Sequence, residues 1–353
     1  MSSVAEIVER AEICICAGAG GVGKTSTSAA IALAAAQRGR KAVVLTIDPA
    51  RRLANALGLE RLGNEPRRVR AVEGGGELWA MMLDAKRTFD ELVDTYAADE
   101  RTRDAVLSNR IYQELSSAVS GSQEYMAMEK LYELHMEGEF DLLVLDTPPT
   151  RNALDFLDAP ERLNRFIDSR SLRFFLSPGV RLLGRGSGLL FAVLRRVTGI
   201  DLLRDMSDFF QSFGDMSDGF RARAERVTEL LASDAATFVL VTSPRRDAVD
   251  DAIFFHDQLA ARGMPFGGVV VNRFHGAGAS EDAVDPEAIL PAELAAKIAA
   301  NYADFQVLSD RDRSNLRRLT ERLSGEPVLV VPELDGDVHD LDGLAAMATH
   351  LWL

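Results

Sequence analysis

The chain has 353 residues, 47% hydrophobic and 27% charged, a composition typical of a soluble globular protein with room for a substantial core. Its formal net charge of -14 disfavours a nucleic-acid partner, because a phosphate-binding surface needs an excess of basic residues. The stretch MSSVAEIVER carries acidic residues where a secretory signal has a basic start, and no uncharged apolar stretch reaches the roughly 18 residues of a membrane span. We therefore expect a cytoplasmic protein.

The two cysteines, Cys14 and Cys16, alternate with isoleucines in a short apolar run. This pattern indicates two small buried side chains on one face of a strand rather than a metal or redox pair. The five histidines show no ligand spacing with the cysteines or with each other. We expect no zinc site, and no metal apart from the magnesium that accompanies a nucleotide.

Short apolar runs rich in Val, Leu and Ile recur along the chain, each bounded by turn residues. They span residues 12–18, 41–48, 77–84, 140–149, 236–244, 266–273 and 327–334. Their length and composition predict parallel strands that are buried on both faces. Helical patterns lie between them, for example at 25–40 and 245–263. The alternation predicts a doubly wound, mainly parallel α/β sheet whose ligand sits at the carboxyl ends of the strands.

Two long segments interrupt this alternation. Residues 85–138 and 153–230 have mainly helical patterns and are too long to be simple crossovers. We assign them to a helical subdomain inserted in the sheet domain, and residues 276–290 to a polar surface loop. The sheet domain then comprises residues 1–84, 139–152 and 231–353.

One motif carries the chemistry. The stretch AGAGGVGKTS, residues 17–26, contains the pattern G-x-x-x-x-G-K-[ST] between a predicted strand and a predicted helix. In such a loop, backbone N–H groups and the helix N-terminus hold the phosphates, the lysine reaches the β and γ oxygens, and the hydroxyl binds Mg²⁺. The sequence thus predicts an ATP site with Thr25 as a magnesium ligand; its nucleotide-binding residues are Gly18, Gly20, Gly21, Val22, Gly23, Lys24, Thr25 and Ser26.

Two carboxylates follow neighbouring apolar runs. Asp146 ends DLLVLD, the position from which a carboxylate binds Mg²⁺ through water, and Asp48 ends VVLTID in the same way. An acid at the end of one buried strand is common. Two acids at adjacent strand ends that face one phosphate site form a much more specific pair.

The segments GAGGVGKT, TIDPARRLANALG, SGSQEYMAMEKL, DTPPTRNALDFLDAP and VVVNR occur in an order that resembles the anion-transporting ATPases (ArsA) and the ATPase that targets tail-anchored membrane proteins. The resemblance covers nearly the whole chain, and its details are most similar to the actinobacterial BagB-type paralogue. It implies a P-loop NTPase fold and a dimeric ATPase whose nucleotide sites face each other across the subunit interface.

The resemblance also implies roles for single residues. Asp48 would position the attacking water, and Lys24 would act with it on the phosphates. The two switch segments would contain Asp48, Pro49 and Arg51 in the first and Asp146, Pro148 and Arg151 in the second. Asn272 would contact adenine and Pro332 would help to close the base pocket; without the resemblance, a strand-end turn residue is the favoured interpretation of Asn272.

The sequence departs from the family at Ala19, where a lysine normally supplies charge in trans to the partner's phosphates. Three explanations stay open: a heterodimer with a lysine-bearing paralogue, replacement of the charge by Arg51, Arg52 or Arg151, or a weakly hydrolysing nucleotide binder. The thiolate cluster for arsenite and the zinc-bridging CxxC pair of the two family archetypes are also absent from the sequence. Arsenite pumping is therefore disfavoured, and the chain is expected to form a homodimer or a heterodimer through contacts without metal.

A stripe of apolar residues suggests what the ATPase acts on. Leu190, Leu194, Val197, Met206 and Phe210 have helical spacing. Such a stripe is either core or, as the resemblance implies, part of a groove for a hydrophobic protein segment or lipid-like client. Residues 161–204 hold nine arginines and three acids, which suits either transient contact with an anionic membrane surface or a solvated helix face.

The main alternative function is a regulatory or scaffold subunit that binds ATP with little turnover. A small-molecule ligase is a more distant one, because the sequence shows no signature of a second substrate pocket.

Overall fold

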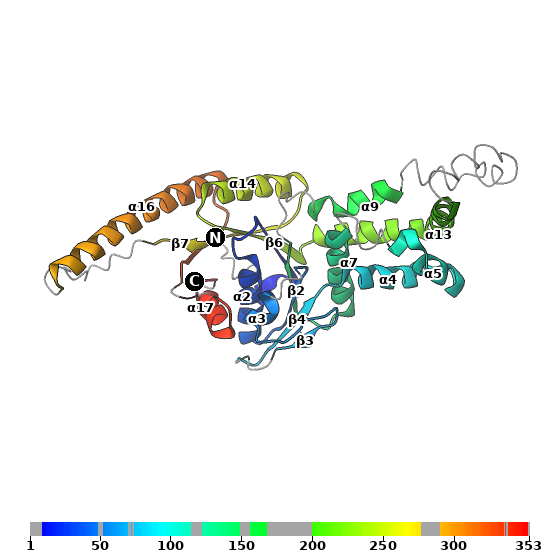
Figure 1. Cartoon of the computed structure of the whole chain (residues 1–353), viewed down its shortest axis with the longest axis horizontal. Helices are drawn as coiled ribbons and strands as arrows, with labels where there is room; N and C mark the ends of the chain where they lie inside the picture. The colour runs from blue at the N-terminus through cyan, green and yellow to red at the C-terminus, as the bar shows by residue number, and fades with distance from the viewer. Residues whose placement is uncertain are drawn as a thin grey trace.

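The computed structural model describes residues 9–48, 52–69, 72, 74–113, 122–148, 156–167, 200–276, 290–334, 336 and 338–351. Its strands are β1 (Ile13–Ala17), β2 (Lys41–Thr46), β3 (Arg67–Arg68), β4 (Glu77–Met82), β5 (Leu142–Asp146), β6 (Ala236–Thr242), β7 (Phe266–Phe274) and β8 (Val328–Pro332). They form one sheet in the order β3-β4-β2-β5-β1-β6-β7-β8 (Figure 1). Neighbouring strands are parallel except β3 and β4. The predicted doubly wound, mainly parallel fold is confirmed.

Each of the seven predicted apolar runs coincides with one strand of this sheet, and β7 extends one residue beyond its run. The sequence analysis missed only the two-residue strand β3. Both of its residues, Arg67 and Arg68, are exposed at the edge of the sheet, where β3 pairs with β4. A strand without buried side chains leaves no apolar pattern in the sequence.

Side chains of the central strands alternate between two cores. Ile13 and Ile15 of β1 pack in a cluster that includes residues of α7 (Ser122–Glu137) and α13 (Ile200–Leu231). Cys14 and Cys16 point to the other face, into a cluster with the alanine-rich helix α2 (Lys24–Gln37). Both thiols are fully buried, as the sequence predicted. Within the described ranges, no group of three or more potential metal ligands occurs.

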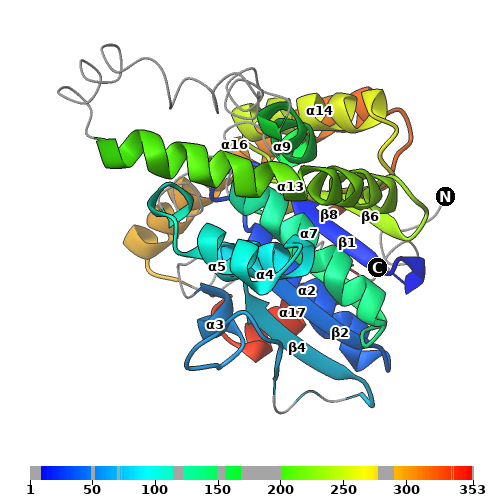
Figure 2. The same cartoon turned by 90° about the vertical axis from the view of Figure 1, so that its right-hand side faces the viewer.

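Helices α4 (Ala85–Tyr96), α5 (Glu100–Leu107), α9 (Ala159–Ile167), α7 and α13 come from the intervals with mainly helical patterns. They lie together on one side of the sheet, and Figure 2 shows them in front of the strands. The short helix α3 (Arg52–Ala56) and the C-terminal helix α17 (Leu341–Leu351) pack against α2 on the other face. No helix of the described segments has both the length and the apolar character needed to cross a bilayer.

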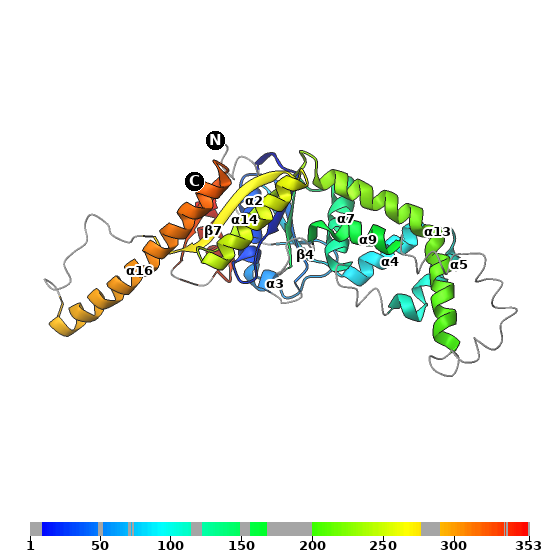
Figure 3. The same cartoon turned by 90° about the horizontal axis from the view of Figure 1, so that it is seen from above.

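Helix α14 (Arg246–Ala261) matches the predicted helix at 245–263 and runs beside the C-terminal half of α16 (Ala292–Leu323). The N-terminal half of α16 continues past α14 and projects from the sheet domain (Figures 1 and 3). In the C-terminal half, Ser309, Asp312, Leu319 and Leu323 are buried, whereas Ala295 is the one buried residue between Ala292 and Leu308.

An ion pair joins α7 to α13. The Arg223 guanidinium donates to Oε1 of Glu129 from Nε at 2.6 Å and from Nη2 at 2.5 Å, and it stacks over the Tyr132 ring, 3.8 Å from the centroid. The Glu129 side chain is 2% exposed, and its Oε2 is buried without a hydrogen bond. Burial raises the pKa of Glu129, although Arg223 opposes that rise. In the chain, α7 precedes β5 and α13 precedes β6, so this ion pair links the two helices that come before two central strands.

We predict that Arg223→Leu lowers the free energy of unfolding at pH 7 by about 3–5 kcal/mol, because it leaves a buried carboxylate without its partner. This loss of free energy of unfolding should become smaller as the pH falls. Removing Arg223 raises the pKa of Glu129 in the folded state further above its unfolded value. The loss of stability therefore develops as the pH rises from the unfolded-state pKa toward the folded-state pKa of Glu129.

Urea unfolding at pH 5 and pH 7 measures both effects. The double variant Glu129→Leu with Arg223→Leu is the matched control, and it should recover much of the loss because no charge remains buried. Equal losses in the single and double variants would contradict this account.

Candidate functional site

The loop from Gly18 to Gly23 joins β1 to α2 and adopts a conformation that its glycines permit. A Cβ at Gly18 would lie 2.0 Å from the carbonyl oxygen of Val241. Gly23 has φ 96°, and a Cβ there would lie 2.2 Å from Nδ2 of Asn272. Gly23 is also the N-cap of α2, where no side chain caps the helix, so the N–H groups of the first turn are open to an anion.

Lys24 folds back over the same loop. Its Nζ donates to the carbonyl oxygens of Gly18 at 2.9 Å and Ala19 at 2.8 Å. The side chain is buried, and this burial lowers the pKa of Lys24. The ammonium group is thus held at the mouth of the loop by two neutral acceptors, which phosphate oxygens can replace.

Asp146 lies at the centre of a hydroxyl network at the carboxyl ends of β2 and β5. Its Oδ2 accepts from Oγ1 of Thr25 at 2.7 Å and from Oγ1 of Thr46 at 2.9 Å. Thr46 and Asp146 are partners in the strand register, which places the hydroxyl beside the carboxylate. Oδ1 of Asp146 is buried and has no hydrogen bond.

The Asp146 carboxylate and the Thr25 hydroxyl fit a magnesium ion. A carboxylate with a free oxygen beside a threonine hydroxyl offers the hard oxygen ligands that Mg²⁺ prefers, and Mg²⁺ usually keeps several waters. A bound cation would also reduce the electrostatic cost of the buried charge, because burial raises the pKa of Asp146 to about 6. Thr25 would bind the ion directly, and Asp146 would bind it through water.

Asp48 follows β2 and is half-buried. Its backbone N–H donates to Oγ1 of Thr46 at 3.2 Å, so the same hydroxyl connects Asp48 to Asp146. Arg52, the first residue of α3, is exposed and lies 4.0 Å from Oδ2 of Asp48. The Thr46 hydroxyl thus links Asp48 and Asp146, two of the expected switch residues.

The remaining expected switch residues are placed as follows. Pro148 follows β5 and is half-buried. Pro49, Arg51 and Arg151 lie outside the described residues. Among the three arginines proposed to replace the missing lysine, the structure therefore describes Arg52 alone.

Asn272 is placed near the end of β7, where its Nδ2 donates to the carbonyl oxygen of Val22 at 3.0 Å. This bond connects the end of β7 to the phosphate loop and uses one of the two N–H donors of the amide. Pro332 ends β8 and is half-buried. Gly20 and Gly21 are exposed at the tip of the loop, and Ser26 is half-buried in the first turn of α2.

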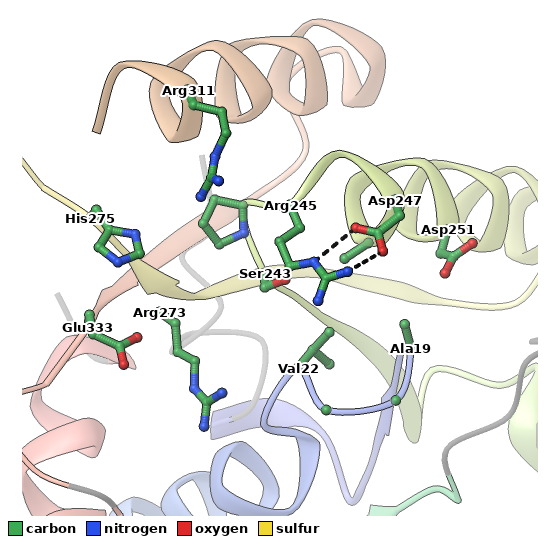
Figure 4. A pocket seen from close by; sticks show the side chains of 14 residues that line it. Ala19, Val22, Ser243, Arg245, Asp247, Asp251, Arg273, His275, Arg311 and Glu333 are labelled. Atoms are coloured by element: carbon green, nitrogen blue, oxygen red, sulfur yellow. Dashed lines mark hydrogen bonds and ion pairs between the residues drawn. The ribbon is translucent and has the colours of Figure 1, made fainter. Parts of the chain in front are cut away.

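A cavity of about 300 Å³ adjoins the loop at Ala19, Gly20, Gly21 and Val22. Its wall contains several charged or polar side chains from the ends of β6 and β7, the start of α14, α16 and the segment after β8: Ser243, Arg245, Asp247, Arg273, His275, Arg311 and Glu333 (Figure 4). Asn272 and Pro332 are not among the lining residues.

The sequence analysis missed the cations of this cavity. Arg273 has φ 60°, a left-handed conformation that is uncommon for a residue with a side chain. His275 and Arg311 both contact the buried Asp312, through Nδ1 at 2.7 Å and Nη2 at 3.0 Å. Arg273 was visible in VVVNR, but nothing in the sequence showed that α14 and α16 bring further basic side chains to it.

The residues expected to line a client groove are less informative. Leu190, Leu194 and Val197 lie outside the described residues. Met206 and Phe210 lie on α13, whose backbone is described there while these two side chains are not.

A model of the anion-transporting ATPase family matches residues 11–311 of this chain. The chain belongs to the anion-transporting ATPase family. The matched residues include the phosphate loop, Asp48, Asp146 and the cavity residues up to Arg311.

Individual relatives match the chain at 24–32% identity. The chain is 30% identical over 143 residues to the ATPase ASNA1 homolog 1 of Paramecium tetraurelia, covering 38% of this chain and 40% of that protein. It is 26% identical to the ATPase GET3 of Kluyveromyces lactis, over 67% of this chain and 64% of the relative. It is 30% identical to a putative arsenical pump-driving ATPase of Halobacterium salinarum, over 39% of this chain and 22% of the relative.

We predict that Asp146→Asn stabilises the nucleotide-free protein at pH 7.5 by about 2–3 kcal/mol, since a carboxyl group whose pKa rises by about two units on folding carries that cost once it is ionised. The gain should vanish near pH 4, where the carboxyl is protonated in the folded protein. Urea unfolding at the two pH values, with Mg²⁺ removed, tests this expectation.

Asp234→Asn is the control, because Asp234 is exposed and its change should leave stability within about 0.5 kcal/mol. A loss of stability in Asp146→Asn at pH 7.5 would show that the hydroxyl network depends on the negative charge.

Proposed function

We propose that this chain is a Mg²⁺-dependent ATPase whose helical part, residues 85–138 and 153–230, moves with the nucleotide state. The observation that supports it most directly is the hydroxyl network at Asp146, in which Thr25 of the phosphate loop and Thr46 of the strand before Asp48 share one carboxylate oxygen. A change at the phosphates is thereby transmitted to the ends of both β2 and β5.

In this proposal the phosphates of ATP take the place of the Gly18 and Ala19 carbonyls on Lys24, and the open N–H groups of α2 bind the β-phosphate. Thr25 and Asp146 would hold a magnesium ion, which would supply positive charge to the phosphates. Asp48 accepts a hydrogen bond from the attacking water and orients it toward the γ-phosphorus. The base lies near Asn272 and Pro332, whose chain neighbours Arg273 and Glu333 line the cavity.

We further propose a dimer that acts on a hydrophobic client or lipid-like ligand, with Leu190, Leu194, Val197, Met206 and Phe210 in the groove. This part rests on the resemblance to the tail-anchored-protein-targeting ATPase and to BagB-type paralogues. The helices of the helical part connect directly to the site, because α7 precedes β5 and the Glu129 to Arg223 pair ties α7 to α13. Weak hydrolysis in a regulatory or scaffold subunit is the alternative, and Ala19 is the observation that favours it.

Asp48→Asn tests the role of the switch carboxylate. We expect ATP affinity to change little, because Asp48 does not hold the phosphates, while turnover falls by about 100-fold or more. Steady-state phosphate release and binding of a fluorescent ATP analogue measure the two quantities on the same sample. Normal turnover in this variant would remove Asp48 from the mechanism.

Ala19→Lys tests whether a charge supplied in trans is missing. We expect the wild-type chain alone to turn over slowly and the variant to be at least about tenfold faster, since such a charge is worth far more than that in other phosphoryl-transfer enzymes. If the wild type is already fast and the lysine adds nothing, the charge comes from within the chain.

A donor subunit makes this test sharper. The double variant Ala19→Lys with Lys24→Ala cannot use its own site, so any rise in turnover when it is added to wild type arises at wild-type sites. Lys24→Ala without the new lysine is the matched donor control. A rise with the first donor alone supports the paralogue explanation, and no rise with either donor contradicts it.

A further inference from the structure

The end of β7 is irregular. In its register with β8, Val271 pairs with Val330. The next pairing joins Phe274 to Pro332, which leaves two residues of β7 opposite one residue of β8. An extra residue of this kind is a β-bulge, which is rare between parallel strands and frequently re-aims a side chain next to an active site. The two residues in the bulge are therefore candidates for a role in the neighbouring cavity.

Arg273, the second residue of the bulge, has a backbone conformation that costs free energy. Its φ of 60° lies in the left-handed region, which glycine adopts far more readily than a residue with a Cβ. Strain of this kind concentrates at sites that bind ligands. Asn272, the first residue of the bulge, bonds to the carbonyl oxygen of Val22, and Val22 lines the same cavity as Arg273 (Figure 4). The bulge thus places two successive polar residues beside the phosphate loop.

The Arg273 guanidinium is available to a ligand. Arg273 is exposed, and it has no hydrogen bond or ion pair with any other described residue. The two other arginines in the cavity wall already have partners, because Arg245 pairs with Asp247 and Arg311 with Asp312. Among the arginines that line the cavity, Arg273 is thus the one without a carboxylate partner in the described part of the chain.

Glu333 brings the opposite charge to the same cavity (Figure 4). It follows β8, and its backbone N–H donates to the carbonyl oxygen of Phe274 at 3.0 Å, which ties it to the residue after Arg273. Its carboxylate has no partner among the described residues, and no ion pair joins it to Arg273. One ligand in the cavity can therefore use both a group that donates hydrogen bonds and a group that accepts them.

This combination suits a purine better than a phosphate. An ionised carboxylate only accepts hydrogen bonds, and phosphate oxygens have none to offer it. Adenine supplies both kinds of partner, since its ring nitrogens accept and its amino group at C6 donates. Guanine has a carbonyl oxygen at C6 instead. A carboxylate beside that position favours adenine, because with guanine it would face another acceptor.

We propose that Arg273 and Glu333 bind the base of ATP and select adenine over guanine. Arg273 donates to a ring nitrogen, and Glu333 accepts from the amino group at C6. The inference rests on the proposed function in that the site takes a nucleotide, and it gives the residues that follow Asn272 and Pro332 a role of their own. The bulge and the left-handed backbone of Arg273 then serve to direct its side chain into the cavity.

Binding of three probes to the full-length chain tests this proposal. The probes are non-hydrolysable analogues of ATP and GTP and inorganic tripolyphosphate, each with Mg²⁺, and calorimetry gives their affinities. Arg273→Ala should weaken the ATP analogue by about tenfold or more and leave tripolyphosphate unchanged, because it removes a charged donor from the base alone. Glu333→Gln should lower the preference for the ATP analogue over the GTP analogue by about tenfold, since its amide can donate to the guanine carbonyl.

Arg246→Ala and Glu326→Gln are the matched controls. Both residues are exposed and neither lines the cavity, so these variants should bind all three probes like the wild type. Equal losses of the ATP analogue and tripolyphosphate in Arg273→Ala would place the guanidinium on the phosphates and overturn the proposal. An unchanged preference between the two analogues in Glu333→Gln would overturn it as well.

Arg273→Gly separates binding from folding. Glycine adopts a φ of 60° readily, so the midpoint of urea unfolding should be equal to or higher than that of the wild type. Affinity for the ATP analogue should nevertheless fall as it does in Arg273→Ala. A stable glycine variant with full affinity would show that Arg273 does not bind the nucleotide.

ATP turnover measured on the same samples distinguishes this inference from the proposed function. A chain that binds the probes with the expected selectivity but shows no turnover would leave the base contacts intact and contradict the ATPase proposal. Turnover with unchanged affinities in the Arg273 and Glu333 variants would contradict the base contacts alone.

Discussion

The carboxylate of Asp146 is the constraint on which the site depends. It is buried at the end of a central strand, where burial raises its pKa to about 6 and the hydroxyl donors of Thr25 and Thr46 oppose that rise. Thr25 comes from the phosphate loop and Thr46 from the neighbouring strand, so satisfying one oxygen fixes the relative positions of α2, β2 and β5. The second oxygen is buried without a hydrogen bond, which fits the proposed magnesium site.

The parallel sheet explains why this constraint can be met. Parallel neighbours bring their carboxyl ends to one edge, and the register pairs Thr46 with Asp146 and Cys16 with Asp146. The small side chains of β1 and α2 allow the helix to approach closely, so its N-terminus and the phosphate loop lie over that edge. Sequence features that look unrelated, namely buried cysteines, an alanine-rich helix and two strand-end acids, thus serve one geometry.

Much of this geometry could be predicted from the sequence because its signals are local. The phosphate loop is a contiguous motif, and the buried strands are apolar runs bounded by turns. Thr46 was not predicted, because its role depends on the register between strands that are 100 residues apart. The bond from Asn272 to Val22 spans 250 residues, and the cavity combines side chains from β6, β7, α14 and α16. Such contacts depend on how distant segments pack, so they produce no local pattern in the sequence.

The fold of Lys24 onto the loop has a consequence for the cycle of the protein. Since the Gly18 and Ala19 carbonyls accept from the ammonium group, departure of a nucleotide does not leave a buried cation without partners. Hydrogen bonds that the chain itself supplies therefore lower the energetic cost of releasing a nucleotide. Binding exchanges one set of hydrogen bonds for another, so occupancy can follow the surrounding nucleotide concentration without the protein having to refold.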